Sequence, residues 1–227
     1  MTDIRQEAVR MPTTARLLRW TGLAALMGGI IFAGIQPIHP PDFLALVTTG
    51  PWAIITALKL VMCFLFLFGI AGNSVRQIGT SGWLRLTGFG LFGLSSALQS
   101  GFVFAEVFIL RTLATASPAF VDSFKGLVNG SPGHMNIEAI VPACMMLGTL
   151  YLFGGLLFGI ATFHAKALPR TPTVLLAVSA LFLPAAVLPP NEIQRLAGMS
   201  MGLSPEWLGY APWSKRQAED AQIPQSA

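Results

Sequence analysis

Long apolar stretches, separated by short polar or proline-rich turns, run through most of the chain. A helix needs about 20 apolar residues to cross a hydrocarbon core of about 30 Å, because each residue rises about 1.5 Å. No stretch alternates apolar and polar residues as a barrel strand would. The sequence therefore predicts an all-α integral membrane helical bundle with five to six transmembrane helices. The predicted segments are residues 17–36, 51–72, 83–115, 136–164, 173–188 and about 193–213.

Proline, glycine and asparagine predict where these helices end. Pro37 follows the first segment, and Pro51 is a favourable first residue for the second. The third segment would be roughly 50 Å long if it stayed helical, so it should tilt strongly or protrude. Residues 116–134 contain two Ser-Pro pairs and an Asn-Gly, which predict a loop.

The last two segments are less regular. The fifth is short and contains Pro184, which should kink it. Pro205 and Glu206 interrupt the sixth, which either crosses the membrane or lies in its interface as an amphipathic helix. The predicted organisation is a cytoplasmic tail over residues 1–15, one bundle domain over residues 16–213, and a polar tail over residues 214–227.

Composition agrees with a membrane protein. Hydrophobic residues make up 53% of the 227 residues and charged residues only 11%, whereas about a quarter is usual for a soluble domain. The net charge of +4 is modest and lies mostly in loops and tails, which argues against nucleic acid as a partner. The first fifteen residues lack the apolar core of a cleavable signal peptide, so the first helix is expected to be an uncleaved anchor.

Lysine and arginine gather in alternate connections between the segments, and this asymmetry predicts the orientation. The cation-poor connections hold none, two and one of these residues, at Arg111, Lys125 and Arg195. By the positive-inside rule, both termini should be cytoplasmic and the chain should lie in the cell inner (plasma) membrane. The cations on the predicted cytoplasmic side are Arg5, Arg10, Arg16, Arg19, Arg76, Arg85, Lys166, Arg170, Lys215 and Arg216.

Lys59 lies within the second apolar segment, where a cation is costly. The predicted orientation places it about 12 Å below the outer edge of the membrane. At this depth the long side chain can extend to the headgroups, which is the simplest explanation. The alternative is an anionic partner inside the bundle, because ionisable groups within membranes usually pair with one another.

Residues of the third and fourth segments offer such partners. Gln99 and Glu106 are seven residues apart on one face of the third segment, at a height that Lys59 can reach. His134 and Glu138 fall near the first turn of the fourth segment, on the same side of the membrane. We therefore predict a ligand-binding site of Lys59, Gln99, Glu106, Glu138 and His134. The alternatives are a solvated rim and, for Glu138, a favourable charge at a helix N-terminus.

No established site motif accompanies these residues. His39 and Asp42 follow the first segment on the same side, but no His or carboxylate spacing indicates a metal site. Cys63 and Cys144 lie in separate apolar runs, so a disulfide framework is not expected. The cofactor is unknown, and with no catalytic motif an enzyme ranks last among the possible functions.

Small residues at a spacing of four indicate close helix packing in membranes. Gly155 and Gly159 form such a pair in the fourth segment, and Gly29 and Ala33 form one in the first. They predict packing seams within the bundle or between protomers.

Two stretches, "LFGIATFHAKALPRTPTVLLAVSALF" and the closing "WLGYAPW", lie mainly within residues 155–213. On these stretches the second half of the chain resembles small multi-pass bacterial membrane proteins of unknown function. The resemblance implies a six-helix integral membrane protein with cytoplasmic termini, and it assigns no binding or catalytic residue. The chain departs from the pattern at Pro205 and Glu206, where an uninterrupted apolar helix is expected.

Two functions remain open from the sequence. The first is binding or transport of a small ligand or ion through an outward-facing polar pocket. The second is a non-catalytic accessory or scaffold role in a larger membrane complex. The expected partners are the lipid bilayer and either a second copy of the chain or another membrane subunit.

Overall fold

A computed structural model describes residues 2–41, 43–76, 82–129 and 133–165, with single positions at Val174, Val178 and Leu181. The described residues are helical or connecting and contain no strand, which confirms the predicted all-α class. The sixth predicted segment lies outside the described residues, and the fifth is described only at those three positions.

Four of the described helices are long and apolar enough to cross a membrane, and they match the first four predicted segments. The helices are α1 (Thr2–Ile35), α3 (Gly50–Arg76), α4 (Gly82–Phe104) with its continuation, and α7 (Ile140–Ala165). The stretches that could span are Arg16–Ile38, Gly50–Val75, Gly82–Ala116 and Ile140–His164.

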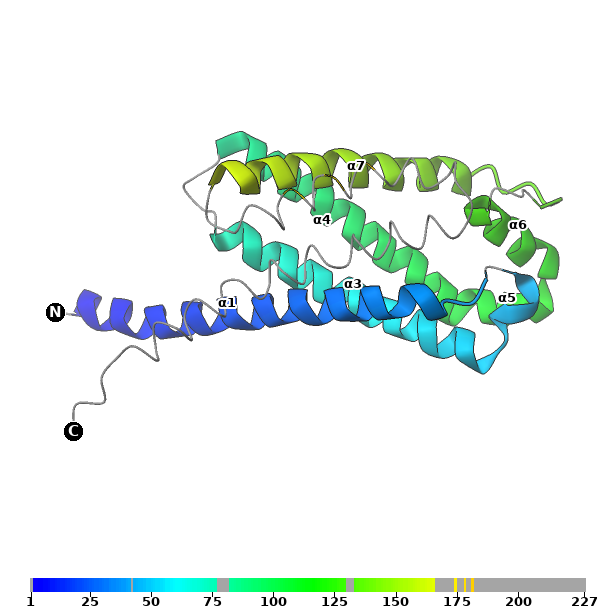
Figure 1. Ribbon diagram of the computed structural model, residues 1–227, viewed down its shortest axis with the longest axis horizontal. Helices are drawn as coiled ribbons and strands as arrows, with labels where there is room; N and C mark the ends of the chain where they lie inside the picture. Colours follow the sequence, from blue (N-terminus) through cyan, green and yellow to red (C-terminus); the bar gives the residue numbers. More distant parts are fainter. Residues whose placement is uncertain are drawn as a thin grey trace.

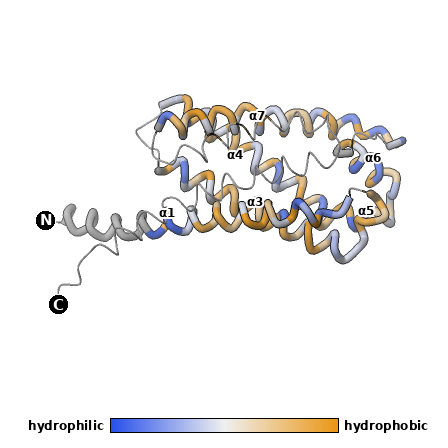
Figure 2. The backbone as a smooth tube through the Cα atoms, in the orientation of Figure 1, coloured by the Kyte–Doolittle hydropathy of each residue, from blue (hydrophilic) through white to orange (hydrophobic). Residues whose placement is uncertain are grey.

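The long helices lie side by side in the order α1, α3, α4, α7 (Figure 1). α3 packs against α1 and α4, and α4 packs against α7. Apolar residues run along most of each helix, not along one stripe only (Figure 2). Large apolar side chains such as Trp83, Ile54 and Met145 are exposed, which is typical of helices that contact lipid.

The third predicted segment is not one regular helix. α4 ends at Phe104 and is followed by a π-helical turn, η2 (Ala105–Leu110), and then by α5 (Arg111–Ala116). A π turn has i→i+5 hydrogen bonds and often marks a functional site. The sequence predicted the total length of this segment correctly, but it did not predict the π turn.

The predicted loop at residues 116–134 contains a helix, α6 (Pro118–Asn129), so that prediction was wrong. The turn residues act at its ends: Pro118 is the first helical residue, where its missing N–H costs nothing, and Asn129 is the last. Between them, Val121, Phe124 and Lys125 are buried on one face.

The start of α7 also differs from the prediction. The helix begins at Ile140, so His134 and Glu138 precede its first turn. The Asn136 side-chain oxygen accepts a hydrogen bond from the Glu138 N–H at 3.0 Å, a local turn that competes with helix formation.

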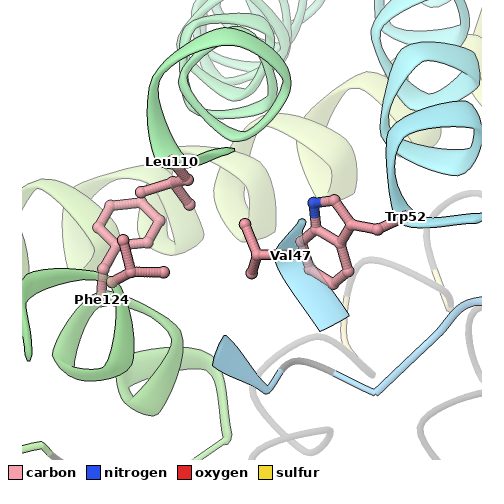
Figure 3. Close-up of a cluster of buried hydrophobic side chains, with 5 residues drawn as sticks. Val47, Trp52, Leu110 and Phe124 are labelled. Atoms are coloured by element: carbon pink, nitrogen blue, oxygen red, sulfur yellow. The ribbon is translucent and has the colours of Figure 1, made fainter. Parts of the chain in front are cut away.

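One end of the bundle is closed by a cap, formed by α2 (Leu44–Val47), α5 and α6 (Figure 1). The chain enters the cap from α1 through a short 3-10 turn, η1 (Gln36–Ile38). Five buried side chains hold the cap to α3 and η2, and Figure 3 shows their mutual packing. They are Val47, Trp52, Leu110, Val121 and Phe124.

Glycines allow the closest approach between two of the long helices. A Cβ atom at Gly88 of α4 would lie 2.5 Å from the Phe158 nitrogen of α7, and one at Gly154 of α7 would collide with the backbone of Phe92. These contacts need glycine, because any side chain would force the backbones apart.

Candidate functional site

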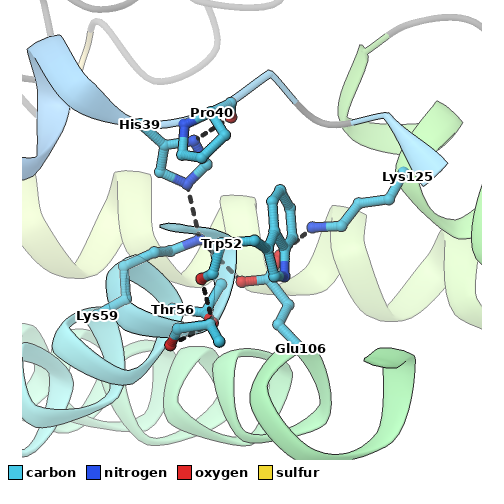
Figure 4. A network of polar contacts seen from close by, with 8 residues as sticks. His39, Pro40, Trp52, Thr56, Lys59, Glu106 and Lys125 are labelled. Atoms are coloured by element: carbon cyan, nitrogen blue, oxygen red, sulfur yellow. Dashed lines mark hydrogen bonds and ion pairs between the residues drawn. The ribbon is translucent and has the colours of Figure 1, made fainter. Parts of the chain in front are cut away.

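Two lysines share one carboxylate beneath the cap (Figure 4). The Lys59 Nζ donates a hydrogen bond to Glu106 Oε2 at 2.8 Å, and the Lys125 Nζ donates to Glu106 Oε1. The three residues come from α3, η2 and α6. We call them the charge cluster.

An indole and an imidazole surround the charge cluster. The Lys125 Nζ lies 4.3 Å from the centre of the Trp52 ring, within the range of a cation–π contact. The His39 Nε2 is 3.5 Å from the Lys59 Nζ, and the His39 ring meets the Trp52 ring edge to face. Figure 4 shows all five side chains converging on one region between the cap and the helices.

The cluster is strongly buried. Lys125 is 1% exposed and Glu106 is 9% exposed, while the Lys59 side chain is 20% exposed. Removing such charges from water is expensive, and close pairing is what makes it tolerable. The Lys59 ammonium therefore pairs with a carboxylate inside the protein. This is the second of the two explanations considered from the sequence; the first was extension of the side chain to the headgroups.

Local features of α3 and η2 accompany the ion pair between Lys59 and Glu106. Thr56 lies one turn before Lys59 and donates its hydroxyl to the Trp52 carbonyl at 2.8 Å, so its polar atom is satisfied within α3. Glu106 is the second residue of the π turn, which widens the helix at this point. This widening changes the direction of the side chains relative to those of a continuous α-helix.

The sequence reasoning missed Lys125, which it counted only as a loop cation. The signal was present in the spacing of Val121, Phe124 and Lys125, which lie on one face of a helix if residues 118–129 are helical. It also missed the role of Trp52, whose ring no sequence pattern connects to a lysine 73 positions further along the chain.

A cavity of about 420 Å³ lies between the four long helices. Its wall is mostly apolar and includes side chains of α1, α3, α4 and α7. Lys59 belongs to both the cavity wall and the charge cluster, whereas Glu106, Lys125 and His39 do not line the cavity. Lys59 therefore lines the cavity while its ammonium is paired with Glu106.

Gln99 also lines the cavity and is exposed, so it marks a place where the cavity opens. The structure thus brings Lys59 together with Glu106 by an ion pair and with Gln99 through a shared cavity wall. His134 and Glu138 are both exposed, and no contact in the described part of the chain joins either to the cluster. Asp42 lies outside the described residues.

The small residues predicted to pack between helices are removed from the surface to different degrees. Gly155, Gly159 and Gly29 are buried, and Ala33 is half-buried. At Gly28, next to Gly29, a Cβ atom would lie 2.9 Å from the Phe66 ring of α3. Whether these small residues also serve contacts between protomers stays a prediction.

Among the described residues, no three His, Cys, Asp or Glu side chains gather as metal ligands would. Comparisons with protein-family models, with curated proteins and with solved structures found no match.

Proposed function

We propose that this chain is a multi-pass protein of the cell inner membrane that holds a small ligand in the cavity between its helices. The observation that carries this proposal is the cavity itself. Its volume of about 420 Å³ falls within the range of roughly 300–1,000 Å³ that is usual for small-molecule sites. Binding sites in helical membrane proteins are typically built between helices in this way.

The proposed orientation has both termini in the cytoplasm and the cap on the outer side. Arg16, Arg19 and Arg85 support it, because they fall at or near the starts of the possible spans Arg16–Ile38 and Gly82–Ala116, and both stretches run towards the cap from the opposite end of the bundle (Figure 1). In this orientation Lys59 and the charge cluster are at the outer end of the cavity, and the exposed Gln99 marks an opening near the same depth.

The charge cluster supports a binding site by fixing the geometry of its outer end. A buried carboxylate between two ammonium groups holds α3, η2 and α6 in one arrangement, since any other leaves charges unpaired. The cluster therefore holds the Lys59 side chain at the wall of the cavity.

Gly148 provides a direct test, because it lines the cavity and a Cβ atom there meets nothing within 4 Å. A Gly148→Leu side chain has room at its Cβ and should occupy part of the cavity, where it would obstruct a bound molecule. Gly101→Leu is the matched control: Gly101 also has open space, but it does not line the cavity. The measurement is native mass spectrometry of protein released gently from its own membranes.

We expect a bound small molecule on the wild type and on Gly101→Leu, and its loss from Gly148→Leu. An unliganded wild type would contradict the proposal and favour the accessory-subunit alternative. Equal occupancy in both variants would show that the molecule binds elsewhere, and this would also contradict it.

A further inference from the structure

Asn73 is a buried amide in the cavity wall, at the end opposite Lys59. It is only 6% exposed, and its side chain has no hydrogen-bond partner among the described residues. An amide that is mostly removed from water and has no protein partner costs free energy unless a ligand or a water molecule bonds to it. The cavity provides the space for that partner.

The distance between the two polar ends indicates the length of the ligand. Lys59 and Asn73 are both on α3 and are fourteen positions apart, which corresponds to about 21 Å along the helix. The lining residues of α7 extend over a similar length, from Cys144 to Phe158. Because the cavity has a volume of only about 420 Å³ over this length, it must be narrow.

The wall between these ends is mostly apolar, although the Gln99 amide and the Tyr151 hydroxyl also belong to it. Met62, Phe66 and Ile70 of α3 supply one side of it. The hydroxyls of Ser95 and Ser96 also line this region, but they donate to the carbonyls of Leu147 and Phe92 at 3.2 and 2.8 Å. Their donors are already used, so this part of the cavity suits a hydrocarbon.

We infer that the ligand is a single-chain amphiphile, with a hydroxyl, amide or acid head group bonded to Asn73 and its hydrocarbon chain directed along α3 towards Lys59. This inference rests on the proposed function and names its ligand class. The chains of one membrane leaflet are about 15 Å long, half of a 30 Å core, so a chain with its head group fits the cavity length.

The direction of the amphiphile follows from the two ends. The Lys59 ammonium is already paired with Glu106, whereas the Asn73 amide is not engaged within the described part of the chain, so the head group is placed at Asn73 and the end of the hydrocarbon beside Lys59. Asn73 is near the end of the stretch Gly50–Val75 that could span the membrane, at headgroup depth. With the proposed orientation, the ligand has the same direction as a lipid of the cytoplasmic leaflet.

Photocrosslinking in lipid nanodiscs tests this inference. The probe is hexadecanol with a diazirine at the end of its chain, and the control is the hexadecane analogue, which lacks the hydroxyl. We expect the alcohol to label the region of Met62 and Val103, near the Lys59 end of the cavity. Asn73→Leu should lower this labelling by up to about tenfold, the effect of one lost hydrogen bond, and should leave the weaker hexadecane labelling unchanged.

Asn73→Leu should also keep or raise the melting temperature of the ligand-free protein, because it removes an unpaired buried amide. A lower melting temperature would show that the amide has a structural partner and would overturn the inference. Labelling near Ile70 and Phe158, or equal labelling of wild type and Asn73→Leu, would also overturn it. If hexadecanol does not label the protein as expected, but Gly148→Leu still loses the bound molecule seen on the wild type, only the ligand class is wrong. If both fail, the proposed function falls as well.

Discussion

Lys59 of α3 and Glu106 of η2 form an ion pair across 47 positions of sequence, with 2.8 Å between Nζ and Oε2. The same carboxylate also accepts a hydrogen bond from Lys125 of α6. This one buried group therefore connects a long helix, a π turn and the cap. Its removal should have a larger effect on the fold than the removal of either lysine.

Glu106→Gln leaves two buried ammonium groups without their shared carboxylate. Breaking a buried ion pair from one side typically costs about 3–5 kcal/mol, so we expect a loss of stability of that order. Thermal unfolding in detergent, followed by circular dichroism, measures it. The matched control is Glu138→Gln, which changes an exposed carboxylate and should shift stability by no more than about 0.5 kcal/mol. Equal effects of the two substitutions would contradict the burial of the cluster.

The losses of stability caused by Lys59→Met and Lys125→Met should not be additive. Each single variant leaves Glu106 with the other lysine, whereas the double variant removes both ammonium groups from a carboxylate that is 9% exposed. We expect the double variant to lose about 0.5–3 kcal/mol more than the sum of the two single losses. The same unfolding measurement provides the complete cycle. Additive losses would mean that the two lysines do not share the carboxylate.

The closeness of Lys59 and Glu106 could be predicted from sequence because it depends on few steps. Apolar length determined the helices, cation counts predicted their direction, and the rise per residue gave the heights. Lys125 could not be placed by this reasoning, because Ser-Pro and Asn-Gly were interpreted as a loop and not as the ends of α6. The π turn was also missed, since no residue pattern distinguishes it from a continuous α-helix.

Gly88→Ala and Gly154→Ala should weaken the contact between α4 and α7. The added Cβ atoms would collide with the backbones of Phe158 and Phe92, and overpacking of this kind typically costs about 1–3 kcal/mol. The control is Gly90→Ala in α4, where a Cβ atom meets nothing within 4 Å and alanine favours the helix. Thermal unfolding should show lower melting temperatures for the first two variants only. A stable Gly88→Ala protein would contradict the close approach of these helices.

Cysteine labelling tests the proposed orientation. In a chain with Cys63→Ala and Cys144→Ala, Asp122→Cys places a thiol on the exposed side of α6, and Trp83→Cys places one near the start of α4. A membrane-impermeant maleimide added to spheroplasts should modify the Asp122→Cys thiol, and should modify the Trp83→Cys thiol only after permeabilisation. The reverse pattern would place the cap in the cytoplasm.

The cavity was not predictable from periodicity. Its wall combines residues of four helices, and most of them, such as Phe66 and Leu147, are also ordinary packing residues in any apolar segment. The sequence did not indicate that Asn73 lines a cavity either, because a polar residue at the end of the second segment is expected in a polar turn. Only the packing of α3 against its neighbours shows that this amide is buried.

The most direct test is a structure of the protein, purified from its own membranes into lipid nanodiscs and enlarged by a bound antibody fragment for electron cryo-microscopy. We predict continuous elongated density between α3, α4 and α7, with one end within hydrogen-bonding distance of the Asn73 amide and the other beside the Lys59 stem. A cavity that contains no density, or one filled by side chains of the protein itself, would contradict the proposed binding function.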